Sequence, residues 1–339
     1  MADLPGLDRP FIGAPMAGGP STPELAAAVC EAGGLGQLAG AYLGVEDLRA
    51  RIGRTRELTS RPFGVNLFVP TDTTDAARPE VERYAAALRP EAERHGLTLP
   101  EPDWHDTDHW EDKLALLVAE PVAVVSFHFG CPPPQVVQRL HDVGARVVIS
   151  ATSPEEAIAA EAVGADAVCL QAATAGGHRG THTVAADPND LDAPALLAAA
   201  LPVVTVPLVV AGGLATREQA RAVLAAGATA VQVGTALLRT PEAGTRAVHR
   251  EALVASGSSG TVVTRAFTGR PARALRNRFT DRYGDLAPPA FPVVGQLTAS
   301  LRARAAADGD PQGMALYAGT RHREARAEPA GEVVRDLSG

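Results

Sequence analysis

Val143-Gly-Ala-Arg-Val-Val-Ile149 joins the end of a helical pattern to a short run of apolar, β-branched residues. The same order of glycine, alanine and an apolar run recurs at Val163-Gly-Ala-Asp-Ala-Val168 and Ala226-Gly-Ala-Thr-Ala-Val231. Glycine commonly ends a helix in the left-handed conformation, and an apolar run of this length is typical of a strand buried on both faces. The repetition therefore predicts parallel strands joined by right-handed crossovers.

Eight such strands, with helices between them, are predicted along the chain. The strands are expected at residues 11–14, 34–39, 63–68, 123–129, 146–151, 167–171, 208–211 and 230–233. The helices are expected at residues 22–32, 45–56, 134–143, 154–163, 193–201, 217–226 and 241–256, with Ser21, Ser153, Thr216 and Thr240 as N-caps. This order predicts an α/β protein built on a (β/α)8 TIM barrel, with a doubly wound open sheet as the alternative.

Two segments interrupt the alternation and are predicted to form a smaller second domain. One is an insertion after the third strand, with helical patterns at 79–94 and 109–119, and the other follows the last strand and carries a helix at 292–307. The last residues are charged and nearly without apolar side chains, so we expect them to be disordered. The expected boundaries are 1–70 and 120–256 for the barrel, 71–119 and 257–320 for the lid or substrate domain, and 321–339 for the tail.

The composition argues against several classes of partner. Thirteen acidic and five basic residues lie between Thr71 and Glu120, which accounts for the net charge of −8. The other charges are balanced and form no basic stripe for nucleic acid and no polybasic segment for a membrane. Cys30, Cys131 and Cys169 are too few and too dispersed for a disulfide framework, so a reducing, cytoplasmic setting is expected.

No metal site is predicted. His105, Asp106, Asp108 and His109 carry ligating atoms, but acidic surface loops collect such residues by chance. The first predicted strand also lacks the His-x-His pair of an amidohydrolase-type metal centre.

The strand predicted at 167–171 runs into a glycine-rich loop that holds the candidate for catalysis. Gly176, Gly177 and Gly180 surround His178, and such glycines let backbone N–H groups approach a ligand closely. Histidine titrates nearest to neutral pH, and loops after parallel strands carry the chemistry of α/β barrels. We interpret His178 as the catalytic candidate, with a role only in stabilising a tight turn as the alternative.

Two further glycine loops follow the last two predicted strands. They are Ala211-Gly-Gly-Leu-Ala-Thr216 and Val233-Gly-Thr-Ala-Leu-Leu238, and each opens toward a helix. Loops at these two positions of an α/β barrel form a phosphate site from backbone N–H groups. Either loop alone is explained by a tight turn, but the pair predicts a phosphate site.

Polar residues at other strand ends suggest what carries that phosphate. Asn66, His128 and Gln171 each follow an apolar run, and amide groups suit the edge of a flat heterocycle. Together with the phosphate loops they predict FMN lying across the barrel mouth. The first loop, which contains Ala14 and Met16, is expected to supply backbone under the flavin ring.

In a series of motifs the chain resembles the class I nitronate monooxygenase family, formerly called 2-nitropropane dioxygenases. The motifs are Ala14-Pro-Met-Ala-Gly-Gly-Pro-Ser-Thr-Pro-Glu-Leu-Ala26, Gly64-Val-Asn-Leu-Phe68, Val125-Ser-Phe-His-Phe-Gly130, Ala175-Gly-Gly-His-Arg-Gly180, Val210-Ala-Gly-Gly213, Gln232-Val-Gly-Thr235, Gly269-Arg-Pro-Ala-Arg273 and Leu316-Tyr-Ala-Gly319. The resemblance implies an FMN-binding barrel with a second domain and no metal. It also implies oxidation of an alkyl nitronate by O₂ to a carbonyl compound and nitrite, with propionate 3-nitronate among the candidate substrates.

The resemblance also implies roles for individual residues. His178 takes the catalytic position, and His128 is a secondary candidate for contact with substrate. FMN contacts are implied for Asn66, Gln171, Gly176, Gly213, Gln232, Val233, Gly234 and Thr235. The expected partners are therefore a nitronate or nitroalkane and O₂, with monomer and dimer both open.

Two other functions remain open from the sequence. An FMN- and NAD(P)H-dependent enoyl-acyl carrier protein reductase shares the Ala-Gly-Gly-His loop and is the alternative enzyme. A phosphate-binding barrel without flavin, or a flavin carrier without catalysis, is the non-redox alternative.

Overall fold

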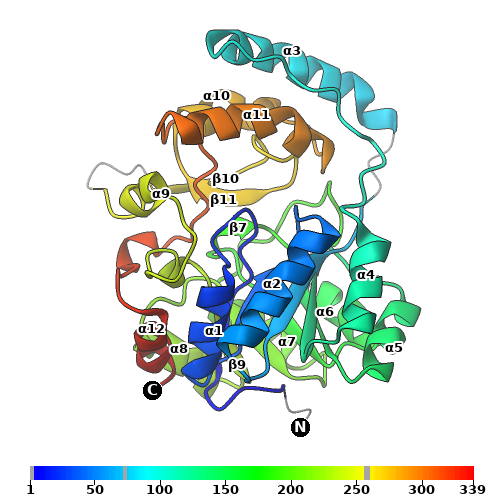
Figure 1. Ribbon diagram of the computed structural model, residues 1–339, viewed down its shortest axis with the longest axis vertical. Coiled ribbons are helices and arrows are strands. Elements are labelled where there is room, and N and C mark those ends of the chain that lie inside the picture. The colour runs from blue at the N-terminus through cyan, green and yellow to red at the C-terminus, as the bar shows by residue number, and fades with distance from the viewer. Residues whose placement is uncertain (1–3, 72–74, 256–259) are drawn as a thin grey trace.

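Eight parallel strands form the central sheet of the computed structural model, which describes residues 4–71, 75–255 and 260–339 (Figure 1). They are β1 (Phe11–Gly13), β2 (Gln37–Ala39), β3 (Gly64–Phe68), β4 (Val124–His128), β5 (Arg146–Ala151), β6 (Ala167–Gln171), β8 (Leu208–Ala211) and β9 (Ala230–Val233). Every strand lies inside its predicted range, because strands buried on both faces are continuous apolar runs.

Hydrogen bonds close this sheet into a barrel. The strands follow the order β1-β9-β8-β6-β5-β4-β3-β2. The two ends of that order meet at a bridge between Ile12 and Leu35. There the Gly13 N–H donates to the Leu35 carbonyl, and the Leu35 N–H donates to the Phe11 carbonyl, each at 2.9 Å. The (β/α)8 barrel is confirmed, and the open sheet is ruled out.

Helices surround the barrel. They include α1 (Pro23–Glu31), α2 (Val45–Leu58), α4 (Trp110–Ala119), α5 (Pro134–Asp142), α6 (Pro154–Ala162), α7 (Ala193–Ala200) and α8 (Arg217–Ala225). Ser153 and Thr216 are N-caps, as predicted. Helix α1 is capped by Thr22 instead of Ser21, because the Ser21 hydroxyl accepts a hydrogen bond from the Met16 N–H at 2.8 Å.

The helix predicted at 241–256 is wrong in its first part. Helix α9 spans only Ala247–Ala252, and Thr240 does not cap it. The Thr240 hydroxyl instead donates to a backbone carbonyl at 2.9 Å, closing the turn that follows the short 3₁₀ helix η2 (Thr235–Leu237). The predicted end at Ser256 lies outside the described residues.

Helix α4 packs with the barrel, which corrects the domain boundary expected at residue 119. Trp110, Leu114 and Leu117 are buried in the same hydrophobic cluster as the barrel strands. The helix lies beside α2 and α5, in the position of the helix between β3 and β4. The part of the insertion that leaves the barrel is therefore shorter than predicted.

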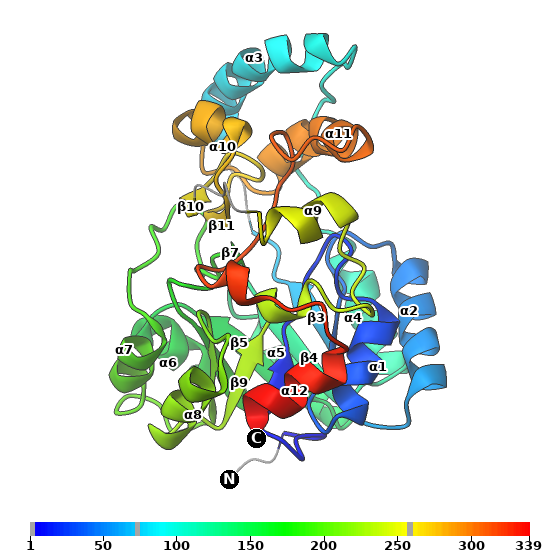
Figure 2. The same cartoon turned by 90° about the vertical axis from the view of Figure 1, so that its left-hand side faces the viewer.

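The C-terminal segment folds onto the barrel, so the prediction of a disordered tail at 321–339 is wrong. Helix α12 (Ala330–Ser338) packs against both α8 and α1 (Figure 2). Its Val333, Val334 and Leu337 side chains are buried in the barrel cluster. The chain leaves the barrel after β9 and returns with α12, which thereby supplies the eighth outer helix.

A second hydrophobic cluster lies above the barrel in Figure 1 and joins the insertion to the C-terminal segment. It is formed by α3 (Arg78–Arg94), α10 (Arg278–Tyr283) and α11 (Val293–Ala307), together with the loops between them. The buried carboxylate of Glu91 accepts two hydrogen bonds from the Arg278 guanidinium, at 2.6 and 2.9 Å. These bonds hold the pKa of Glu91 below its usual range. We interpret this cluster as the core of the second domain.

A small sheet lies between the two clusters and includes the histidine loop. Its order is β10 (Thr261–Thr264), β11 (Ala272–Leu275) and β7 (Gly177–His178), all antiparallel. His178 lies opposite Ala272, and Gly177 lies opposite Arg273. The loop predicted around His178 is therefore partly a strand, which ties the barrel to the C-terminal segment. The remaining 3₁₀ helices are η1 (Asp75–Ala77), η3 (Gly284–Leu286) and η4 (His322–Glu324).

Leu337→Ala is expected to lower the free energy of unfolding by about 2–4 kcal/mol, because Leu337 lies on the buried face of α12 and is only 1% exposed. Urea unfolding followed by circular dichroism measures the change. Glu332→Ala, at an exposed position of the same helix, is the control and should shift stability by less than about 0.5 kcal/mol. Equal effects of the two substitutions would contradict the barrel-completing role of α12.

Candidate active site

A cavity of about 470 Å³ lies at the carboxyl ends of the barrel strands and reaches α11 of the second cluster. Small-molecule sites usually have volumes of about 300–1,000 Å³. Every site residue predicted from the sequence lines this cavity: Ala14, Met16, Asn66, His128, Gln171, Gly176, His178, Gly213, Gln232, Val233, Gly234 and Thr235. The fold thus brings the predicted residues together, while their individual roles stay predictions.

The loops after β8 and β9 present backbone to the cavity. Gly212 and Gly213 have φ angles of 113° and 70°, which favour glycine. A Cβ atom on Gly213 would lie 2.8 Å from the Thr174 hydroxyl oxygen, so a side chain has no room there. Residues 212–214 and 234–236 line the cavity.

A chain of buried polar side chains runs beside the cavity inside the barrel. The Asn66 amide donates to Ser126 Oγ at 3.0 Å, and Ser126 Oγ donates to Gln37 Oε1 at 2.7 Å. Gln37 Nε2 in turn donates to Gln232 Oε1 at 3.1 Å. Because each amide has a fixed partner, Asn66 and Gln232 present defined groups to a ligand. The sequence reasoning missed Gln37 and Ser126, although a polar residue in a predicted buried strand is the signal that identified Asn66.

Gln171 positions the segment that carries the candidate catalytic histidine. Its Nε2 donates to the His178 carbonyl, and its Oε1 accepts from the Gly180 N–H, both at 2.8 Å. The buried Arg179 guanidinium donates to the Gln171 carbonyl at 3.2 Å and also to the Ala172 carbonyl. Any contact between Gln171 and a cofactor is therefore additional to this positioning role.

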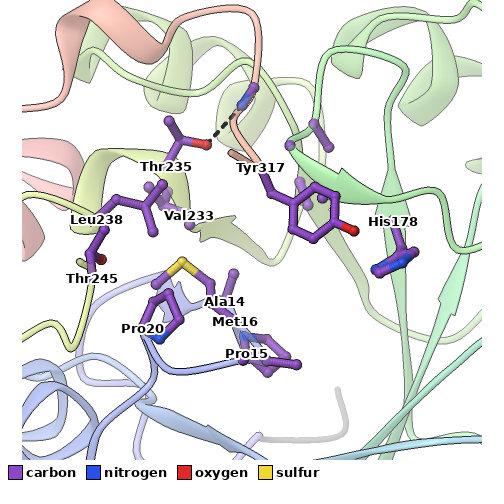
Figure 3. Close-up of a pocket in the computed structure, with 18 of the residues that line it drawn as sticks. Ala14, Pro15, Met16, Pro20, His178, Val233, Thr235, Leu238, Thr245 and Tyr317 are labelled. Atoms are coloured by element: carbon purple, nitrogen blue, oxygen red, sulfur yellow. Dashed lines mark hydrogen bonds between the residues drawn. The ribbon is translucent and has the colours of Figure 1, made fainter. Parts of the chain in front are cut away.

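Gly176 lies where two backbone segments touch. A Cβ atom on Gly176 would lie 2.5 Å from the carbonyl carbon of Ala318. The Gly319 N–H donates to the Thr235 hydroxyl at 3.0 Å, as the dashed line in Figure 3 shows. The segment 317–319 is thereby held between the loop after β6 and the loop after β9.

The imidazole of His178 is surrounded by side chains of the C-terminal segment and of the loop after β4. Its Nε2 lies 2.9 Å from the Thr268 hydroxyl oxygen. The ring centroids of Tyr317, Phe129 and Phe291 lie 5.1, 5.6 and 6.1 Å from that of the imidazole. One ring nitrogen thus has a fixed partner, and aromatic rings restrict water around the other.

This environment keeps the imidazole of His178 neutral at neutral pH. Burial lowers its pKa from the ordinary value of 6.5 to about 3, and His128 and Arg270 act in the same direction. Burial also lowers the pKa of His128 to about 3, although its hydrogen bond to the His178 carbonyl opposes the shift. That bond joins His128 Nε2 to the carbonyl oxygen at 3.4 Å. Both rings are therefore uncharged polar groups at neutral pH.

Thr268 and Tyr317 are site residues that the sequence reasoning did not identify. Both come from the C-terminal segment, far along the chain from His178. The available signal was their position in or beside two quoted motifs, 269–273 and 316–319.

The described residues hold neither a metal-binding group of side chains nor a membrane-spanning helix. Among residues 4–71, 75–255 and 260–339, no group of three or more His, Cys, Asp or Glu side chains is placed to hold a metal ion. Asp108 instead forms an ion pair with Lys113 at 2.8 Å. Within those same ranges, no helix is both long and apolar enough to cross a membrane.

The closed barrel defines an α/β-barrel protein with a cavity at the carboxyl ends of its strands. The sequence pattern of the family described as nitronate monooxygenase matches residues 5–339. A nitronate monooxygenase of Pseudomonas aeruginosa is 40% identical over 344 residues, which cover 98% of this chain and 96% of that protein. The chain therefore belongs to the nitronate monooxygenase family, whose members are oxidoreductases.

Two solved structures resemble the whole chain. Nitroalkane oxidase from Streptomyces ansochromogenes has a TM-score of 0.94 and 49% sequence identity, covering 98% of this chain and 95% of that one. FabK from Thermotoga maritima has a TM-score of 0.77 and 27% identity, covering 99% and 93% of the two chains. The first similarity shows that the Streptomyces protein has the same arrangement of the barrel and the second cluster.

Gly176→Ala is expected to lower the free energy of unfolding by about 1–3 kcal/mol, because the new methyl group would overlap the backbone of residues 318–319. Gly53→Ala is the control, since Gly53 lies in α2 with open space around its Cα and should gain about 0.5–1 kcal/mol. Chemical denaturation of both variants measures the difference. A Gly176→Ala protein as stable as wild type would contradict the close packing of the two segments.

Proposed function

We propose that this protein binds FMN and uses O₂ to oxidise alkyl nitronates to a carbonyl compound and nitrite, with His178 acting on the substrate. The observation that carries the proposal is the convergence of twelve predicted residues on one cavity. Membership of the nitronate monooxygenase family supports the reaction class. The similar Streptomyces protein is named a nitroalkane oxidase, which supports a neutral nitroalkane as a second form of the substrate.

The residues around the cavity suit FMN. The glycine loops at 212–214 and 234–236 offer backbone N–H groups to its phosphate. The fixed amides of Asn66 and Gln232 offer hydrogen bonds to the edge of its ring system. Bound FMN supplies the one-electron chemistry with nitronate and O₂ that no amino-acid side chain of the cavity provides.

We assign the proton transfer to His178. Its Nε2 is committed to the Thr268 hydroxyl, so Nδ1 is the atom at which we place the proton taken from the α-carbon of a neutral nitroalkane. The lowered pKa of His178 makes the imidazole a weak base. Proton transfer, however, forms an anionic nitronate beside the imidazolium, and this opposite charge favours the protonated ring. A preformed nitronate would form the same pair of charges once the ring has taken a proton from solvent.

The phenylalanines around His178 serve the same step. Phe68, Phe129 and Phe291 surround the imidazole with ring centroids 5.6 to 6.3 Å away. Apolar rings at this distance keep bulk water from the charged pair, and charges in a dry cavity interact more strongly than in water. The surrounding aromatic rings therefore lower the pKa of His178 and would strengthen its interaction with a bound anion.

The first experiment measures cofactor and products together. The purified protein should be yellow, with about one FMN per chain, and should release nitrite while consuming O₂ with ethyl nitronate or propionate 3-nitronate. His178→Ala should keep its FMN and lose about 10²–10⁴-fold in kcat/KM for neutral nitroethane, as expected for removal of a positioned base. Unchanged turnover would remove His178 from the mechanism. Anaerobic bleaching by NADH or NADPH, without nitrite from any nitronate, would favour the reductase alternative.

The pH dependence provides a separate prediction. A base with a pKa of about 3 in the free enzyme is unprotonated at every pH above that value. For a neutral nitroalkane, kcat/KM should therefore stay level from about pH 8 down to about pH 5. Initial rates of nitrite formation across this range, with His178→Ala as the background control, measure it. A fall with a midpoint near 6.5 would show that the histidine keeps its ordinary pKa.

A further inference from the structure

The hydroxyl of Tyr317 is a buried polar group that faces the same space as His178. The two ring centroids are 5.1 Å apart, and Figure 3 shows the phenol oxygen on the side of the ring that faces the imidazole. Within the part of the chain that the structure describes, this oxygen has no hydrogen-bond partner. Buried hydroxyls are normally hydrogen-bonded, so a partner from a bound molecule is expected.

The backbone fixes Tyr317 in this position. The residue forms a bridge with Ala274 of β11, and the Ala318 N–H donates to the Arg273 carbonyl at 3.3 Å. The Gly319 N–H is bound by the Thr235 hydroxyl on the other side. Because the backbone is held at Tyr317 and at the two residues after it, the fold limits the orientation of the Tyr317 ring.

The nearest protein groups leave the phenol available as a donor. The Thr268 hydroxyl, which is hydrogen-bonded to His178, also interacts with the phenol and lowers the pKa of Tyr317, but it lies outside normal hydrogen-bond geometry from the phenol oxygen. Burial is the stronger influence and raises the pKa of Tyr317, so the phenol stays protonated at neutral pH. A protonated phenol donates a hydrogen bond, which is what an oxyanion requires.

A positive charge stands beside the same space. Arg302 of α11 lines the cavity, with Nε donating to Thr298 at 3.1 Å and Nη2 donating to the Gly295 carbonyl at 2.9 Å. Its charge lowers the pKa of Tyr317 and of His178, which places it within electrostatic reach of both. A hydroxyl donor in a cationic field favours an anionic, oxygen-bearing ligand.

We propose that the Tyr317 hydroxyl donates a hydrogen bond to a nitro oxygen of the substrate, while His178 acts from the facing side. This inference rests on the proposed function and adds a substrate-binding residue to it. The nitro oxygens gain negative charge when the nitronate forms, so a donor aimed at them binds the anion more strongly than the neutral nitroalkane. Tyr317 thereby selects the anionic form, and the field of Arg302 adds to that preference.

Tyr317→Phe tests this directly, because it removes one oxygen atom and keeps the ring. The dissociation constant of nitrate, a planar and unreactive oxyanion, is measured from the change in the flavin absorption spectrum. We expect it to rise about 10-fold or more, and kcat/KM for ethyl nitronate to fall about 10- to 100-fold, with FMN content unchanged. Tyr283→Phe is the matched control, since Tyr283 lies in the second cluster and its hydroxyl is 3.5 Å from a Glu91 oxygen.

Each outcome decides the proposal. Nitrate affinity and kcat/KM within 2-fold of wild type would overturn it, and so would loss of FMN or of cooperative unfolding in Tyr317→Phe but not in Tyr283→Phe. In that last case the hydroxyl would serve the cofactor or the fold. If wild type binds nitrate in a Tyr317-dependent way but makes no nitrite, the proposed reaction fails while the anion site at Tyr317 stands.

Discussion

The pairing of two residues from the barrel with two from the C-terminal segment is the contact on which the site depends. Gly177 and His178 form a ladder with Arg273 and Ala272, so the imidazole is carried by a strand of the small sheet. Gln171 and Arg179 hold the same segment to the end of β6. The backbone of His178 is therefore hydrogen-bonded both to the barrel and to the C-terminal segment, and the two attachments together set the position of its ring.

This double attachment explains the electrostatics of the cavity. A histidine on an open barrel loop would be solvated and would keep a pKa near 6.5. Here aromatic rings from the ends of β3 and β4 and from the C-terminal segment cover it, and burial dominates its titration. The imidazole of His178 is thus uncharged at neutral pH.

The sequence predicted the barrel well because each strand is a continuous apolar run with a helix signal on either side. It also predicted the residues of the cavity, since the carboxyl ends of parallel strands converge by topology alone. It missed Tyr317 and Thr268, because nothing local indicates which later segment covers a given barrel mouth. The helix at 241–256 was misjudged for a different reason, as Thr240 and Pro241 match a helix start but Thr240 closes a turn. The tail was misjudged because its charges masked the helical spacing of Val333, Val334 and Leu337.

The position of α12 has a consequence for how the chain acquires its structure. Seven outer helices and all eight barrel strands precede the C-terminal part of the second cluster, and the eighth helix comes only at Ala330–Ser338. During synthesis, the apolar surface between α1 and α8 stays uncovered until the ribosome has passed these last positions. The groove between α1 and α8 is therefore exposed from the synthesis of α8, which ends at Ala225, until α12 has been made, and exposed apolar surface of this kind favours aggregation.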